Sequence, residues 1–145
     1  MVIINEGKHV GILYHFTDEE GLNGIIDSGG LYSDFYSYIS FTRSFTPPLV
    51  GHLENRYVRF AFDGNKLSNK YKIQPYSDNE FNSNGKEFEE IIKWPHKKLL
   101  KVEFALKRID ILKHSKMKDF SKKEIEEYLK IKLPIYFVDK FRPVR

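Results

Sequence analysis

Residues 13–33 carry the sequence "LYHFTDEEGLNGIIDSGGLYS", in which a short apolar strand runs directly into a helix. The strand is predicted over 12–16, and Thr17 and Glu20 have the spacing of a capping box, whose side chains satisfy free backbone N–H groups where a helix begins. One apolar face of this helix is formed at helical spacing by Leu22, Ile25 and Ile26. The glycine pair at 29–30 predicts the end of the helix, because glycine adopts the left-handed conformation of a helix C-terminus without steric cost.

Most of the remaining chain predicts strands rather than helices. The predicted strands are "DFYSYISFTRSFTPP" (34–48, ended by the proline pair), "YVRFAF" (57–62), "EFEEII" (87–92), "LLKVEFALKRIDIL" (99–112) and "PIYFVD" (134–139). A short helical turn with an extended piece is predicted over 65–76, a polar loop over 76–86, and a second capped helix over 121–131. The strands follow one another too closely for regular crossover helices, so the pattern predicts an α+β fold with a mixed or antiparallel sheet and few helices.

Composition limits the number of domains and the classes of chemistry. With 145 residues, 41% of them apolar, the chain can bury one ordinary core, so a single domain over 1–145 is expected. The 24 basic and 20 acidic residues leave a net charge of +4, which is compatible with an anionic partner but does not identify one. The absence of cysteine excludes thiol nucleophiles, disulfides and Cys-built zinc sites. No apolar run approaches the roughly 18 residues of a membrane span, and the N-terminus lacks the order of a signal peptide, so a cytoplasmic protein with no membrane partner is expected.

His15 stands at the end of the first predicted strand, where an apolar residue would be usual. A single histidine at such a place is more often a core or rim residue that hydrogen-bonds to the backbone. In a nucleotide site, its imidazole would donate a hydrogen bond to a ribose hydroxyl while its other nitrogen is fixed by the protein. Both interpretations stay open for this residue taken alone.

The predicted strand in 34–48 carries polar residues on one face and an arginine near its end. Tyr38, Ser40 and Thr42 alternate with other residues in a pattern that is equally typical of a half-exposed sheet surface. Arg43 must reach solvent or bind an anion, and its rigid guanidinium fits a diphosphate or a carboxylate.

Two acidic residues form a pair in the predicted strand 87–92. Glu87 and Glu89 are two residues apart, so both carboxylates project from one face, while Phe88 and Glu90 project from the other. Such a pair is either a directional acidic site or the solvated edge of a sheet, where charge discourages unwanted strand pairing.

The order of these motifs resembles the ADP-ribosyltransferase superfamily, and within it the DarT-like DNA ADP-ribosyltransferases. The resemblance covers about residues 12–106. It rests on "LYHFTDEEGLNGIIDSGGL", "YISFTRSFTPP" and "KEFEEIIKWPHKKLLKVEFAL", which are similar to a histidine strand with its helix, an aromatic strand that ends in arginine, and a glutamate strand. The resemblance implies an ADP-ribosyltransferase-like split sheet and NAD as the substrate.

The resemblance also implies roles for individual residues. His15 would bind a ribose of NAD, and Arg43 would be catalytic or hold phosphate. Glu89 would be the glutamate common to the fold, and Glu87 would orient the acceptor as the first acid of a Glu-x-Glu pair. The NAD site would further include Thr17, Tyr38, Ser40 and Thr42, with Tyr36 or Tyr38 beside the nicotinamide. All these residues are expected to converge on one cleft.

The implied function is transfer of ADP-ribose from NAD to a macromolecular acceptor, either nucleic acid (DNA or RNA) or protein. Lysine-containing segments such as "KKLLK" and the C-terminal "DKFRPVR" favour nucleic acid, although they are also typical of an ordinary solvated face. Transferases of this kind occur in toxin–antitoxin pairs and in phages. Two alternatives stay open: a catalytically inactive nucleotide- or protein-binding module of the same fold, and an RNA 2′-phosphotransferase.

Overall fold

The computed structural model describes residues 11–33, 38–47, 57–75, 89–113 and 134–145. Its strands are β1 (Ile12–Thr17), β2 (Gly30–Tyr32), β3 (Tyr38–Thr42), β4 (Val58–Asp63), β5 (Gln74–Pro75), β6 (Glu89–Lys93), β7 (Leu99–Lys101), β8 (Leu106–Leu112) and β9 (Ile135–Val138). Its helices are α1 (Glu19–Ser28), α2 (Gly64–Lys70) and the short 3₁₀ helix η3 (Glu103–Ala105). Within these described ranges, no helix is long and apolar enough to cross a membrane. The predicted loop over 76–86, the predicted helix over 121–131 and Glu87 lie outside them.

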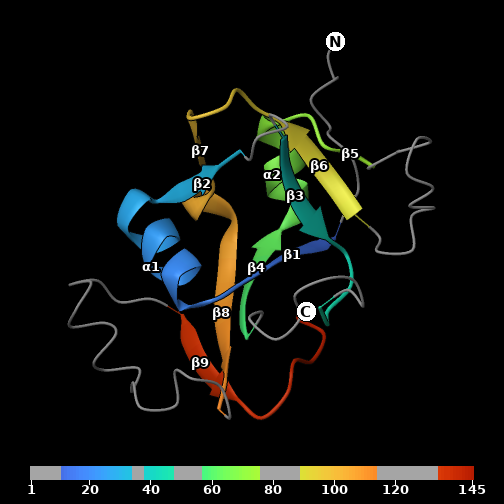
Figure 1. The fold of residues 1–145 in the computed structure, drawn as a ribbon. Helices are drawn as coiled ribbons and strands as arrows, with labels where there is room; N and C mark the ends of the chain where they lie inside the picture. Colours follow the sequence, from blue (N-terminus) through green and yellow to red (C-terminus); the bar gives the residue numbers. More distant parts are fainter. Residues whose placement is uncertain (1–10, 34–37, 48–56, 76–88, 114–133) are drawn as a thin grey trace, which may run out of the picture.

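The described strands form one large sheet and one small sheet. The main sheet is seven-stranded, in the order β5-β6-β3-β1-β4-β8-β9, and β2 pairs with β7 in a second sheet (Figure 1). β8 and β9 run parallel, whereas the other paired strands are antiparallel. The predicted α+β class with a mixed sheet is therefore confirmed.

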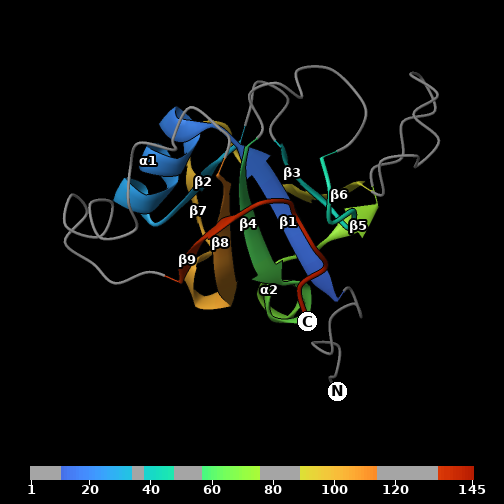
Figure 2. The same cartoon turned by 90° about the horizontal axis from the view of Figure 1, so that it is seen from below.

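The main sheet has two faces that are covered differently. On the helix face, Leu13 and Phe60 belong to one buried cluster with Leu22 of α1 and Leu67 of α2. On the tail face, residues 139–145, here called the C-terminal tail, cross β4 and β1 (Figure 2). The buried residues of the tail-face cluster are Tyr14, Phe16, Ala61 and Phe141. Successive strand residues point to opposite faces, so each residue of a paired strand can be assigned to the helix face or to the tail face.

The helix α1 begins one residue later than the capping box predicts. Its N-cap is Asp18, whose backbone is extended and whose carboxylate accepts a hydrogen bond from the N–H of Gly21 (2.9 Å). Thr17 is instead the last residue of β1, where it pairs with Val58. Aspartate caps helices at least as well as threonine does, and the sheet already uses the backbone of Thr17, so the helix begins after it.

The helix ends at the predicted glycine pair. Gly29 has a left-handed φ of 77°, and its N–H donates to the carbonyl of Ile25 (2.8 Å). Gly30 begins β2, and a Cβ atom there would clash with the carbonyl oxygen of Leu100 in β7. The first glycine is needed for its conformation, and the second allows two backbones to approach closely.

We expect glycine-to-alanine substitutions around α1 to change the free energy of unfolding in opposite directions. Gly24→Ala should raise the free energy of unfolding by about 0.5–1 kcal/mol, because a methyl group at this helical position meets nothing within 4 Å. Gly29→Ala should lower it by about 1–2 kcal/mol, because alanine resists the left-handed conformation. Gly30→Ala should lower it further, since a backbone carbonyl cannot move aside as a side chain can. Urea unfolding measures this order, and a stabilising Gly30→Ala would contradict the close pairing of β2 with β7.

The segment predicted as one strand over 99–112 forms two strands. β7 pairs with β2 in the small sheet and β8 pairs with β4 in the main sheet, with η3 between them. The chain leaves the strand conformation at Val102, where ψ is −2°, and the N–H of Ala105 donates to the Val102 carbonyl (3.0 Å). Apolar residues at 100, 102, 104 and 106 keep strand spacing across this break, so the sequence pattern gives no sign of it.

Candidate functional site

His15 lies in the central strand β1 and is fixed by the neighbouring strand β3. Its Nδ1 atom is 3.1 Å from the backbone carbonyl oxygen of Ser40, and its ring meets the ring of Phe41 edge-on at 6.1 Å. A carbonyl can only accept, so Nδ1 donates, and in the neutral ring Nε2 is then an acceptor. In the nucleotide site expected from the sequence, this histidine donates to a ribose hydroxyl. The geometry favours the reverse, in which the hydroxyl donates to Nε2.

The register of the sheet places Glu90 in the same cross-strand row as His15. Tyr14 pairs with Thr42, which sets His15 opposite Phe41, and Phe41 pairs with Glu90 on β6. Directly paired residues share a face, so this row lies on the helix face, with its outer backbones about 10 Å apart. Glu90 is completely buried, with 0% of its surface exposed. We call His15, Phe41 and Glu90 the histidine–glutamate row.

Glu89, the glutamate chosen from the sequence, pairs with Thr42 and is therefore one residue out of the histidine–glutamate row. Its role stays a prediction, because only its backbone is described. A signal for Glu90 was present in the sequence. Strand alternation places Glu90 with Phe88 and Ile92, and a carboxylate between apolar neighbours on one face is costly unless it is paired or has a function.

The other predicted NAD-site residues divide between the two faces. Tyr38, Ser40 and Thr42 lie on the tail face, because the register sets Thr42 against Tyr14. They do not share a face with His15, to which Ser40 contributes its backbone carbonyl alone. Thr17 shares the helix face with His15 and packs at the start of α1, where a Cβ atom on Gly21 would clash with its hydroxyl. The expected single cleft is corrected accordingly, since alternation on β3 separates these hydroxyl residues from the imidazole.

Arg43 follows the last residue of β3 and is exposed. The turn that carries it is held by hydrogen bonds. The N–H of Ser44 donates to Oγ1 of Thr42 (3.0 Å), and the Ser44 hydroxyl donates to the carbonyl of Thr46 (2.9 Å). The backbone of Arg43 is thus bracketed by bonded residues while its guanidinium faces solvent, where it can meet an anion.

A buried charge cluster, which the sequence analysis missed, lies beside this turn. The guanidinium of Arg59, which is 2% exposed, donates to Oδ2 of Asp110 through Nε (3.1 Å) and Nη2 (2.5 Å). Arg108 donates to the other carboxylate oxygen through Nε (2.8 Å). The rings of Tyr14 and Phe141 flank Arg59, with centroids 4.8 and 4.9 Å from its central carbon. Opposite charges inside two apolar strands, "VRFAF" and "RIDIL", are the signal that could have indicated the pair.

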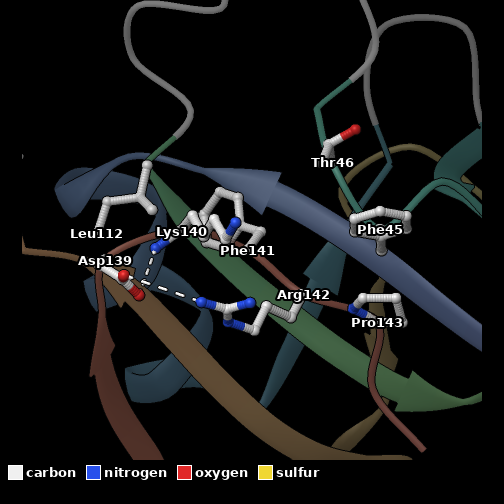
Figure 3. Close-up of a pocket in the computed structure, with 8 residues that line it drawn as sticks. All are labelled: Phe45, Thr46, Leu112, Asp139, Lys140, Phe141, Arg142 and Pro143. Carbon is white, nitrogen blue, oxygen red and sulfur yellow. Dashed lines mark hydrogen bonds and ion pairs between the residues drawn. The ribbon is translucent and has the colours of Figure 1, made fainter.

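A cavity of about 580 Å³ opens between the turn after β3 and the C-terminal tail. Figure 3 shows Phe45 and Thr46 at one end of it, with Pro143 beside Phe45, and Leu112, Asp139 and Lys140 at the other end. The hydrogen bond from the backbone N–H of Asp139 itself and the charge of Arg142 lower the pKa of the Asp139 carboxyl, against the opposing effect of desolvation. Among the described residues that line it, neither His15 nor Glu90 is present. The cavity is therefore separate from the histidine–glutamate row.

No family model, curated protein or solved structure matches this chain. An imidazole and a buried carboxylate lie in one row, and an exposed guanidinium follows β3 two residues after Phe41. This combination suits a ligand that carries both hydroxyl groups and phosphates.

Proposed function

We propose that this chain is an NAD-dependent ADP-ribosyltransferase, which moves ADP-ribose from NAD to a macromolecular acceptor. The sequence motifs supply the resemblance, and the histidine–glutamate row is the observation that carries the proposal. His15 and Glu90 lie in one row about 10 Å wide, within reach of a single NAD molecule. Glu90 is completely buried, and a carboxylate in buried surroundings acts more strongly on a nearby positive charge than it would in water.

In the proposed reaction, the bond between C1′ of the ribose and the nicotinamide nitrogen breaks, and its electron pair leaves with nicotinamide. Positive charge then develops on the ribose, and the Glu90 carboxylate stabilises it more strongly in buried surroundings than in water. Nε2 of His15 accepts a hydrogen bond from a ribose hydroxyl and fixes the sugar. A nucleophilic atom of the acceptor bonds to C1′ and gives its proton to a general base.

Arg43 is proposed to hold the diphosphate of NAD. Arg43 is two positions after Phe41, at most about 7 Å along the chain, so it can serve the same ligand as the histidine–glutamate row. Since Glu90 has no exposed surface, the proposal requires that binding of NAD opens this part of the helix face.

The alternatives differ in what they do to NAD. A transferase releases nicotinamide when it transfers ADP-ribose, or when water takes the place of the acceptor. An inactive module of the same fold would bind a nucleotide without releasing nicotinamide. An RNA 2′-phosphotransferase would release nicotinamide only when a 2′-phosphorylated RNA is present. Release of nicotinamide from NAD alone is thus the experiment that tests the proposal.

Nucleic acid is the favoured acceptor, because lysines lie beside aromatic rings on the described surface. Nζ of Lys98 lies 5.4 Å from the ring of Trp94, and Nζ of Lys70 lies 4.8 Å from the ring of Phe104, which is 41% exposed. Bases stack on aromatic rings while lysines bind phosphates, and phosphate contacts weaken as salt displaces them.

We therefore expect single-stranded DNA to bind at low salt and to dissociate as salt rises. In a titration of labelled DNA, Lys98→Ala should weaken binding and flatten its dependence on salt. Lys113→Ala, an exposed lysine that follows the end of β8 far from η3, is the matched control. If no DNA binds at any salt concentration and a protein is modified efficiently, the acceptor is a protein and not nucleic acid.

A further inference from the structure

Arg59 joins two chain segments that are far apart in the sequence. Its Nη1 atom donates to the carbonyl of Phe45, in the turn after β3, and to the carbonyl of Arg142, in the C-terminal tail, both at 2.8 Å. The remaining nitrogens of the guanidinium bind Asp110, which fixes the plane of the group. Nη1 of Arg59, whose guanidinium is fixed by Asp110, therefore binds both the turn and the tail.

The turn held in this way is the one that carries Arg43. On one side of Arg43, the hydroxyl of Thr42 accepts from the N–H of Ser44. On the other side, the carbonyl of Phe45 is bound by Arg59. The position of the Arg43 backbone therefore depends on a bond whose donor also binds the tail.

The tail has two further attachments to the sheet. Its Val144 N–H donates to the hydroxyl of Tyr14 (3.0 Å), and Phe141 packs against Phe16 with ring centroids 5.4 Å apart. Phe141 is 7% exposed, so this part of the tail belongs to the buried structure. These attachments place the carbonyl of Arg142 at Nη1 of Arg59.

We infer that the C-terminal tail positions Arg43 through Arg59, so that an ordered tail is part of a competent NAD site. Arg59 is a positioning residue in this account, since it acts on the site through the carbonyl of Phe45. The inference rests on the proposed function where it concerns NAD. The coupling between tail and turn stands on the described contacts alone.

Amide hydrogen exchange measured by NMR tests the coupling without any substrate. Tyr14→Phe removes the hydroxyl that accepts from Val144 and keeps the ring. We expect exchange at Val144 and also at Ser44, on the far side of Arg59, to become roughly fivefold faster. Arg59→Lys should have a larger effect at Ser44, because an ammonium cannot reproduce the planar set of four hydrogen bonds. Retained protection of β4 and β8 amides shows that the fold is intact.

Arg108→Lys is the matched control, because Arg108 binds the same carboxylate as Arg59 but neither carbonyl. It should leave exchange at Ser44 at the wild-type rate. If exchange at Ser44 stays unchanged in both Tyr14→Phe and Arg59→Lys, the coupling is wrong.

The second measurement is NAD turnover by the same variants. If Arg43 holds the diphosphate, Tyr14→Phe should raise KM for NAD severalfold with little change in kcat, whereas a loss of folded protein would lower kcat alone. Faster exchange at Ser44 with unchanged KM would overturn the positioning role. A wild-type protein that does not cleave NAD would refute the proposed function, and the exchange measurement would still decide the coupling.

Discussion

Glu90→Gln is expected to lower the rate of nicotinamide release from NAD by about 10²- to 10³-fold, which is the usual cost of removing one preorganised electrostatic group from a transition state. Glutamine keeps the shape of the side chain and removes its charge. The loss should therefore fall on kcat and kcat/KM together, because the carboxylate is needed when positive charge develops on the ribose. The unfolding midpoint, measured on the same variant, checks that the loss of turnover does not come from unfolding.

Three further substitutions make this result specific. Glu103→Gln changes an exposed glutamate in η3 and should leave turnover at the wild-type rate. Glu89→Gln separates the two candidate glutamates: the sequence favours Glu89, whereas the register sets Glu90 in the row of His15. A larger loss in Glu89→Gln than in Glu90→Gln would overturn the assignment to Glu90. Glu87→Gln should reduce transfer more than hydrolysis if Glu87 acts on the acceptor, and equal losses would contradict that role.

Asp110→Asn is expected to lower the free energy of unfolding by about 3–5 kcal/mol, the range found when one partner of a buried ion pair is removed. Asp110 has no exposed surface, and its carboxylate accepts hydrogen bonds from both Arg59 and Arg108. The neutral amide leaves the buried charge of Arg59 without its counter-ion. Chemical denaturation measures the change.

The control for this substitution is Asp139→Asn in the C-terminal tail. Its carboxylate is exposed and lies 3.9 Å from Arg142, so solvent screens the pair. The unfolding midpoint should stay at its wild-type value. If Asp110→Asn lowered the free energy of unfolding as little as Asp139→Asn does, the buried charge cluster would not stabilise the tail face.

The strand and helix pattern of this chain was largely predictable, because alternation and glycine positions act locally. The glycine pair after α1 needed no knowledge of the rest of the fold, since the φ of Gly29 is a local requirement. The choice between Thr17 and Asp18 as the N-cap was not local. It depended on β4, which takes the backbone of Thr17 into the sheet.

The composition of the candidate site depended on register, which a single sequence does not specify. Alternation shows that Glu89 and Glu90 project from opposite faces, but it does not show which face His15 shares. That follows from the pairing of Tyr14 with Thr42 and of Phe41 with Glu90. Arg59 and Asp110 are 51 residues apart, and only their meeting in the folded chain makes them a pair.

Incubation of purified protein with NAD, with released nicotinamide measured over time, tests the central claim most directly. The account predicts steady release by the wild-type protein and release reduced by about 10²-fold or more in Glu90→Gln. Nicotinamide release that is absent from the wild-type protein, with and without single-stranded DNA or protein acceptors, would contradict it.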